Sequence, residues 1–541
     1  MSDAALGVLH DLRRRRKRRR LGEIEWFDAA YRVYLVAMFG GGTVLWISSS
    51  IGDSTVSVSA VADIGRDGPA LLGIITALAF LAALRSGAQG GPLALEAPDV
   101  AYVMLSPVDR MRALLRPVTQ RARSAASLSA VFGAVVGQLA GRRLPGTPVA
   151  WAASGAAFGI ATALLWAGTA LIAHAFRLPL WIATSVGLAG VAWQGVAFAW
   201  HIPGPSNLYG DLAMWGWRQH PIDLAAPVVA VIVLLVGISL LQQTSLDALA
   251  RRSSLVAQLR FAVTMQDLRT VILLRRQLNQ EQTRGRPWVT VPRWVRQPIV
   301  RRGIASLARF PTTRLVRMTA FAAIAGVFQA MVMRGTTPAI FGTALMLFLL
   351  GLEALEPLSQ EVDQPDRTDS LPIERGELMV RHLLAPAIAL IPFACVAAAS
   401  AVAVLGTSRA IVPAAILALP TVLGGAAGGV VSIVRDAPDP TRGGAQQAFV
   451  PPEMAGMSSA LRVGIPILVS ALAASTILLV RYAARAGQQP AGAALRGALG
   501  ASLLILLIGY WVRRRDQWRR RFRNFMSEGR SYAKQQRNTA A

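Results

Sequence analysis

Long apolar stretches separated by short polar segments recur along the whole chain. Windows of about 19 residues identify twelve stretches that could cross a lipid bilayer as helices, which takes roughly 20 apolar residues each. The third stretch, which is short and contains Gln138, and the short seventh stretch are the weakest. The pattern predicts an all-α multi-pass membrane protein with twelve transmembrane helices. The twelve stretches lie near 31–51, 68–84, 127–141, 149–173, 178–199, 223–241, 318–333, 338–356, 383–405, 410–433, 462–481 and 494–512.

Composition agrees with a membrane protein. Of the 541 residues, 53% are hydrophobic and only 16% are charged, whereas soluble proteins average about 25% charged residues. The one cysteine, Cys395, falls within a predicted span, so neither a disulfide nor a cysteine metal cluster can form within one chain. The basic run Arg13–Arg20 is separated from the first span by an acidic and aromatic segment, and we expect no cleavable signal peptide.

The arginines indicate which way the chain crosses the membrane. The net charge is +27, and the basic residues gather in the N-terminal tract and in segments 109–123, 251–317, 367–381 and 513–523. With twelve spans, all of these segments lie on one side, which the positive-inside rule identifies as the cytoplasm. We therefore expect both termini in the cytoplasm and the Arg-rich tails against anionic membrane lipids. Nucleic acid is not an expected partner, because no folded domain positions the basic tract.

The spacing of the spans predicts an internal duplication. The second and eighth spans are about 270 positions apart, and the sixth and twelfth are about 271 apart. Both halves enter the membrane from the same side, so the repeat is a parallel one with six helices in each half. The expected divisions are a basic cytosolic tail (1–22), a first half (23–242), a cytosolic helical linker (243–303), a second half (304–512) and a second basic tail (513–541).

Each half begins with an amphipathic segment. Residues 23–34 and 304–318 each combine an apolar face with charged residues, as interfacial helices do, although soluble linker helices would show the same pattern. Residues 246–278 have helical periodicity and are followed by Gly285 and Pro287, which end the helix. The whole joining segment is too short for an ATPase domain.

A short motif occurs twice, about 265 positions apart, between the second and third spans of each half. We expect each proline to begin a helix, since proline suits the first helical turn. The acid and the arginine could make charge-assisted hydrogen bonds to a partner, or they could be solvated charges at a helix-starting turn. The copies are Pro107-Val108-Asp109-Arg110 and Pro372-Ile373-Glu374-Arg375.

The sequence carries no sign of catalysis. A phosphate-binding P-loop needs a lysine before Ser or Thr, but the only lysines, Lys17 and Lys534, are followed by Arg18 and Gln535. There is no His-Glu-x-x-His zinc motif, so we expect no metal, no cofactor and no enzyme activity in this chain. Charged residues near spans often mark functional sites. Glu353 and Glu356 are the candidates for a span-end polar site, or they are simply interfacial.

The motif and its position resemble the cytosolic loop of ABC-2-type exporter permeases, in particular large duplicated actinobacterial-type permeases. The resemblance implies that the loop after the second span of each half is a coupling helix that docks on a separate nucleotide-binding subunit. Two such subunits would bind ATP and Mg²⁺. It also implies an outer helical hairpin between the fifth and sixth spans, near 200–222. The corresponding segment of the second half, near 482–493, is short, and the family's lysine after the motif is absent; Arg116 and His382 stand nearby.

The resemblance thus implies a permease that moves an unidentified substrate across the plasma membrane, driven by a separate ATPase. Two alternatives remain open at this point. One is a transporter or lipid flippase that needs no ATPase, and the other is a membrane scaffold for envelope assembly.

Overall fold

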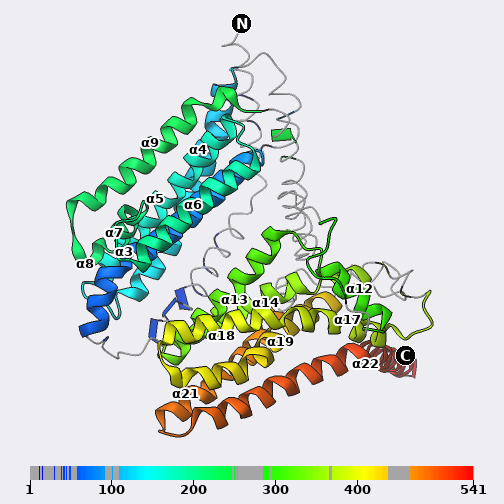
Figure 1. Cartoon of the computed structure of the whole chain (residues 1–541). Coiled ribbons are helices and arrows are strands. Elements are labelled where there is room, and N and C mark those ends of the chain that lie inside the picture. Colours follow the sequence, from blue (N-terminus) through cyan, green and yellow to red (C-terminus); the bar gives the residue numbers. More distant parts are fainter. Residues whose placement is uncertain are drawn as a thin grey trace. The chain divides into compact units, whose positions relative to one another are not determined.

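The computed structural model describes residues 58–91, 109–245, 284–291, 295–362, 370–435 and 464–539, with isolated positions before and between these ranges. Within this part of the chain every regular element is a helix and there are no strands (Figure 1). The chain divides into two compact units, Met1–Gln280 and Glu281–Ala541. Each unit is described by itself below.

Unit 1 is a bundle of long helices with a group of short helices at one end. Candidate membrane spans are Val61–Ala88, Pro148–Ala175, Leu180–Ala199 and Pro221–Ser239. The long helices are α3 (Val58–Ala88), α4 (Arg110–Ala140), α5 (Pro148–Ala175), α6 (Leu180–Ala199) and α9 (Ala225–Ser239). The short ones at that end are α7 (Asn207–Ala213), α8 (Trp215–Arg218) and η2 (Pro221–Leu224), whereas η3 (Leu241–Gln243) follows the other end of α9. Helix α5 is central and packs against α3, α4 and α9.

Helices α4 and α5 touch along their main chains. A Cβ atom added to Gly133 would lie 2.1 Å from the carbonyl oxygen of Gly155, and one added to Gly137 would lie 2.0 Å from that of Trp151. The two α4 glycines are four positions apart and so share one helix face. Small residues at this spacing allow helices to approach closely in membranes, which fixes α4 to α5.

The buried Gln194 of α6 fastens the short helices to α3. Its amide nitrogen donates to the carbonyl oxygen of Ala70 (2.9 Å) and to Oδ1 of Asn207 (2.7 Å), and its amide oxygen accepts from the backbone N–H of Ser206 (3.0 Å). Its three hydrogen bonds therefore join α6 to α3 and to the start of α7. The segment 200–222, predicted as an outer hairpin, forms α7, α8 and the start of η2, packed on α3 and α5.

Unit 2 contains four single candidate spans and two bent helix pairs. The spans are Thr312–Met333, Ser408–Arg435, Gly464–Arg485 and Pro490–Trp518; the pairs bend by 64° after Ala354 and by 45° after Ala389. The helices are α12 (Pro298–Leu307), α13 (Thr312–Met333), α14 (Ala339–Ala354), α15 (Glu356–Val362), α17 (Arg375–Ala389), α18 (Ile391–Leu405), η4 (Ser408–Ala410), α19 (Ile411–Arg435), α21 (Ile477–Arg485) and α22 (Pro490–Thr539).

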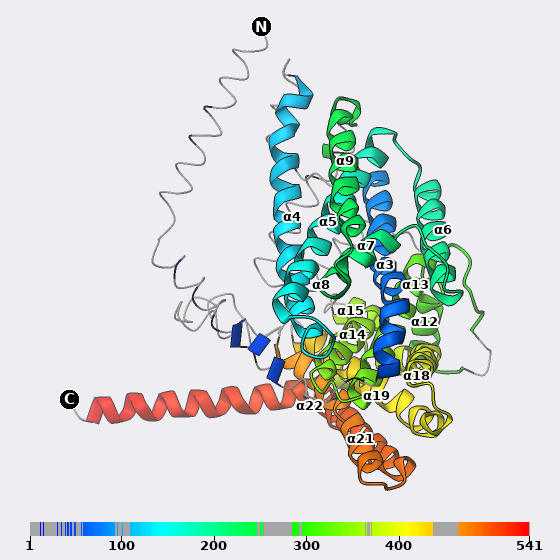
Figure 2. The ribbon, with the colours of Figure 1, turned by 90° about the vertical axis from the view of Figure 1, so that its left-hand side faces the viewer.

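Helix α19 holds the centre of unit 2, where it packs against α14, α18 and α22. Its small residues again permit close approach, since a Cβ atom on Gly351 of α14 would lie 2.6 Å from the Cα of Ala426. Helix α22 continues past the membrane span as one helix to Thr539 (Figure 2). The predicted last span and the basic C-terminal tail thus belong to a single helix.

The described residues contain eight helices long and apolar enough to cross a membrane, or ten if each bent pair is one span. The protein is therefore an all-α membrane protein with multiple spans. The first predicted span, 31–51, lies almost entirely outside the described residues. The third, 127–141, lies within α4, which does not qualify because its first half carries the arginines of segment 110–123.

One expectation about the interfacial helices is wrong. Residues 304–318 do not form a single helix, because α12 ends at Leu307 and α13 begins at Thr312. Pro311 stands between them and separates the two helices, since proline has no N–H and disfavours a helical residue before it. The segments 23–34 and 246–278 lie almost entirely outside the described residues.

Candidate functional site

The first motif copy begins helix α4. Asp109 is the N-cap and accepts a hydrogen bond from the backbone N–H of Met111 (3.1 Å), and Arg110 is the first helical residue. The guanidinium of Arg112 lies 3.7 Å from the same carboxylate. Acidic caps satisfy backbone donors at helix starts and suit the helix dipole. Pro107 and Val108 lie outside the described residues.

The second motif copy begins helix α17 at the same relative position. Glu374 is the N-cap and Arg375 is the first helical residue. The N-cap torsions of the two copies are similar, with φ −57° and ψ 115° at Asp109 and φ −58° and ψ 135° at Glu374. Glu374 is exposed and makes no cap hydrogen bond through its side chain.

The residues before this second N-cap form a turn. The backbone N–H of Ile373 donates to the carbonyl oxygen of Leu371 (2.8 Å), and Pro372 is exposed. The expectation that Pro372 lies in the first helical turn is wrong, because it stands two residues before the N-cap. The cap residue itself, and not the proline, marks where the helix begins.

The first turns of α17 are anchored to the rest of unit 2. A Cβ atom on Gly376 would lie 2.1 Å from the carbonyl oxygen of Arg513 in α22. The buried Met379 joins a core cluster that also contains Leu358 of α15 and Val434 of α19. An exposed helix start therefore continues into a firmly packed helix.

Glu353 and Glu356, the predicted span-end polar site, belong to a buried ion-pair network. Nε of Arg314 lies 2.9 Å from Oε2 of Glu353, and Nε of Arg317 lies 2.9 Å from Oε1 of the same carboxylate. Glu356 lies 3.3 Å from Arg314. The exposed side-chain fractions are only 6% for Arg314 and 10% for Glu353. Two arginines and two carboxylates thus balance each other's charge where α14 bends into α15.

An aromatic residue, Phe310, packs against this network. The guanidinium carbon of Arg314 lies 3.6 Å from the centre of the Phe310 ring. The indole N–H of Trp288 donates to the carbonyl oxygen of Phe310 (2.8 Å), and its backbone N–H donates to that of Ala308 (2.8 Å). Trp288 therefore caps the end of α12 and fixes the corner from which Arg314 reaches the carboxylates.

A second buried polar cluster lies between α15 and α17. Oε2 of Glu361 is 3.5 Å from Nε2 of His382, and the hydroxyl of Thr368 donates to the other carboxylate oxygen (3.2 Å). The side chains of Glu361 and His382 are 4% and 7% exposed. His382, named above only as a neighbour of the motif, is thus part of the contact between these helices.

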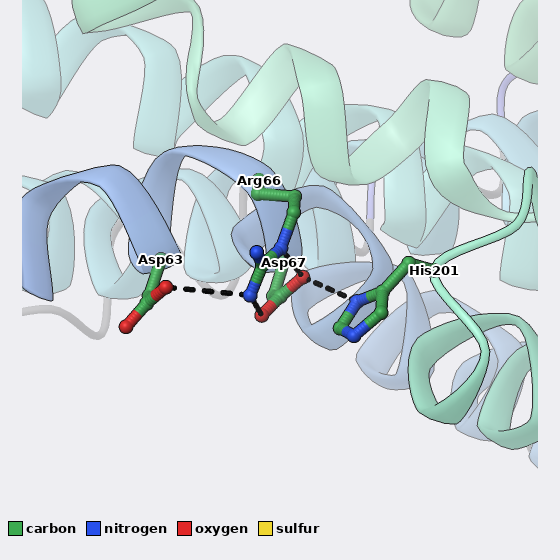
Figure 3. Close-up of polar contacts among 4 residues, drawn as sticks. All are labelled: Asp63, Arg66, Asp67 and His201. Atoms are coloured by element: carbon green, nitrogen blue, oxygen red, sulfur yellow. Dashed lines mark hydrogen bonds and ion pairs between the residues drawn. The ribbon is translucent and has the colours of Figure 1, made fainter. Parts of the chain in front are cut away.

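Unit 1 carries a polar cluster at the end occupied by the short helices (Figure 3). The carboxylate of Asp67 in α3 lies 3.0 Å from Nε of Arg66 and 2.8 Å from Nδ1 of His201. The guanidinium of Arg66 also lies 3.3 Å from the carboxylate of Asp63. His201 lies just beyond α6 with a positive φ of 55°. The contact ties the loop after α6 to α3.

Two ionisable groups of α7 titrate away from their ordinary values. Burial raises the pKa of Tyr209 to about 12. Burial also raises the pKa of Asp211, although the guanidinium of Arg218, 3.0 Å away, opposes that rise.

The sequence-based prediction did not include Arg314, Arg317 or Gln194 as functional residues. The two arginines carried a usable signal, since they stand three positions apart at the start of one span, and Glu353 and Glu356 stand three apart at the end of the next. Neighbouring antiparallel helices bring such pairs together. Gln194 carried no signal in the sequence beyond being a polar residue within a predicted span.

The described residues contain no group of three or more His, Cys, Asp or Glu that could hold a metal ion. Comparison with family models, with curated proteins and with solved structures finds no match. The fold alone defines the class of this protein, a multi-pass α-helical membrane protein, and its function is inferred from its side chains.

Proposed function

We propose that the chain is the membrane-spanning permease subunit of an ABC-type exporter. It would move a substrate across the plasma membrane with energy from two separate nucleotide-binding ATPase subunits, which hold the ATP and Mg²⁺. Asp109, Arg110, Glu374 and Arg375 would contact those subunits. The observation that carries the proposal is the shared local geometry of the motif copies, each with an acid at the N-cap and an arginine at the first helical position.

Exposure of these positions supports a docking role. Arg110 and Glu374 are exposed, and Asp109 and Arg375 are half-buried. Charge-assisted hydrogen bonds from such groups to a partner surface contribute about 1.5–3 kcal/mol each. A structural cap alone explains the acid, but it does not explain an arginine at the positive end of the helix dipole, where cations are disfavoured.

Packing in unit 2 supports transmission of force from the second motif. Helix α17 packs on α15, and α15 follows α14 across a 64° bend. The ion-pair network of Arg314, Arg317 and Glu353 lies at that bend. Movement of the start of α17 would therefore act directly on the bend between α14 and α15. The eighth and ninth predicted spans would then move together.

The pairing of helices supports a repeated body. In unit 1 the predicted fourth span, α5, packs against the second, third and sixth, which are α3, α4 and α9. In unit 2 the predicted tenth span, α19, packs against the eighth, ninth and twelfth, which include α14, α18 and α22. We extend the eight to ten candidate spans to twelve by including 31–51 and α4. An even number of spans puts both termini on the same side of the membrane, and the arginine-rich segments favour the cytoplasm as that side.

The test is affinity purification of the full chain from its native membranes. We expect an ATPase with Walker motifs to co-purify in stoichiometric amounts, and we expect Arg110→Glu with Arg375→Glu to reduce its recovery at least tenfold, since about 1.4 kcal/mol corresponds to a factor of ten. Arg121→Glu with Arg309→Glu is the matched control, because both arginines are exposed and lie outside the motif copies.

Recovery that is unchanged by the motif variant, or lost equally in the control, would refute docking through the motif. If no ATPase co-purifies in mild detergent with nucleotide present, the permease proposal is wrong. Gradient-driven transport without an ATPase would then favour a secondary transporter or flippase, and stable partners without transport would favour a scaffold.

A further inference from the structure

A short segment before α12 folds back on the corner between α12 and α13. The backbone N–H of Arg284 donates to the carbonyl oxygen of Arg309 (3.0 Å), and that of Trp288 donates to the carbonyl oxygen of Ala308 (2.8 Å). The indole N–H of Trp288 donates to the carbonyl oxygen of Phe310 (2.8 Å). The two segments therefore lie side by side, and together they form one surface, the α12–α13 corner (residues 284–289 and 308–310).

The α12–α13 corner lies where a candidate span begins. Phe310 and Pro311 directly precede the span Thr312–Met333. Trp288 and Val289 are 46% and 65% exposed. Tryptophan is enriched at the boundary between lipid and water, where its amphipathic ring lies among the headgroups. The exposed apolar side chains of the corner therefore match the depth of lipid headgroups.

The same corner carries three arginines, Arg284, Arg286 and Arg309. The last two are exposed and Arg284 is half-buried. The chain contains no aspartate or glutamate between Glu281 and Glu353. None of the ion pairs described in unit 2 includes one of these three arginines. The corner therefore presents positive charge to its surroundings.

Trp288 holds the guanidinium of Arg284 in one orientation. The guanidinium carbon lies 3.6 Å from the centre of the indole ring, and the indole is itself fixed by its hydrogen bond to Phe310. A guanidinium stacked on an aromatic face keeps its N–H groups at the edge, where they can donate to two oxygens of one anion. A Cβ atom added to Gly285 would meet nothing within 4 Å, so the space beside this glycine, which stands between Arg284 and Arg286, is open.

The charge and the depth of the corner together select the anion. Arginine forks match the geometry of phosphate oxygens. Basic segments next to a span are attracted to the anionic lipids of the cytoplasmic leaflet, and the predicted topology puts segment 251–317 on the cytoplasmic side. A phospholipid carries its phosphate at the depth of Trp288 and its acyl chains beside the span. A free phosphate would gain nothing from the exposed apolar side chains.

We propose that the α12–α13 corner binds the phosphate headgroup of an anionic membrane lipid, with Arg284 and Arg286 as its main ligands. Trp288 orients Arg284 and lies among the headgroups, and Arg309 adds positive charge. The site belongs to a folded corner of unit 2 and is separate from the basic tails at the two ends of the chain. It needs no ATPase and is independent of the proposed coupling role of the motif.

The experiment is photo-crosslinking of the purified full chain in liposomes, without an ATPase, followed by peptide mapping. The probes are phosphatidylglycerol and phosphatidylcholine analogues with a photoreactive group near the headgroup. We expect phosphatidylglycerol to label residues 284–310 at least tenfold more than phosphatidylcholine does. Arg284→Gln with Arg286→Gln should lower that labelling at least tenfold, because each arginine near an anionic surface contributes roughly a factor of five.

Trp288→Leu tests the orientation of Arg284 separately from its charge. This variant removes the aromatic face and leaves every arginine in place. Labelling by phosphatidylglycerol should fall about two- to fivefold, the loss expected for an exposed cation–π contact. Unchanged labelling would overturn the site, because the corner would then act only as diffuse positive charge.

Arg409→Gln with Arg496→Gln is the matched control, because it removes two exposed arginines of unit 2 that lie outside the corner. It should leave labelling of 284–310 unchanged, and both double variants should unfold within about 2 °C of the wild type. The comparison of the two lipids on the wild type needs no variant. Equal labelling by the two lipids, or an equal loss in the control, overturns the proposal. Competition by soluble glycerol phosphate as strong as that by phosphatidylglycerol also overturns it, because the site would then bind free phosphate and not a lipid.

Discussion

Neutralisation of Glu353 should destabilise unit 2. Its carboxylate oxygens each lie 2.9 Å from an arginine nitrogen, one from Arg314 and one from Arg317. Glu353→Gln keeps the size of the side chain and removes its charge. The carboxylate of Glu356, 3.3 Å from Arg314, is unchanged in this variant.

The expected loss follows from burial. Removing one partner of a buried ion pair costs about 3–5 kcal/mol, because the other charge stays buried. Glu353 keeps 10% of its side chain exposed and glutamine still accepts a hydrogen bond, so we expect the lower limit, about 3 kcal/mol. For a domain of this size 1 kcal/mol shifts the midpoint of thermal unfolding by about 2–4 °C, so the predicted decrease is about 6–12 °C.

The assay is thermal unfolding of the purified full chain in one detergent at pH 7. Glu374→Gln is the control, since this exposed acid makes no cap hydrogen bond, and its midpoint should stay within about 1 °C of the wild type. Glu356→Gln should fall between the two. A Glu353→Gln midpoint indistinguishable from that of Glu374→Gln would refute the reasoning, because the network would then contribute nothing to stability.

Two further predictions concern unit 1. Gly133→Ala should lower the midpoint of thermal unfolding, because the new Cβ would lie 2.1 Å from a backbone oxygen of α5. Gly190→Ala is the control and should not lower the midpoint, because there is open space around Gly190. Equal midpoints for the two variants would contradict the main-chain contact between α4 and α5. Burial raises the pKa of Asp211 above its ordinary value of 3.8. The stabilising contribution of Asp211 is therefore present below that ordinary value and is lost as the pH rises through the raised one. Asp211→Asn removes this pH dependence of stability. The unfolding midpoint of the variant minus that of the wild type should therefore increase between about pH 4 and pH 7. A constant or falling difference would contradict the raised pKa of Asp211.

The sequence by itself determined the membrane class and most helix positions. Apolar runs of about 20 residues have one stable outcome in a bilayer, because a helix satisfies its own backbone hydrogen bonds. Ten of the twelve predicted stretches coincide with candidate spans or bent pairs of the described residues. The motif acids, Asp109 and Glu374, could also be read as helix starts, since capping is a local interaction.

Only the tertiary structure decided which distant polar residues meet. Arg314 and Glu353 belong to separate helices, and no local pattern states which faces of those helices turn toward each other. The same holds for Gln194, whose three hydrogen-bond partners come from α3 and from the start of α7. Hydrophobicity determines which segments cross the membrane, but it does not determine which of these helices pack against each other. Those neighbours are chosen by close packing at small residues such as Gly133 and Gly351 and by the need of buried charges for a partner.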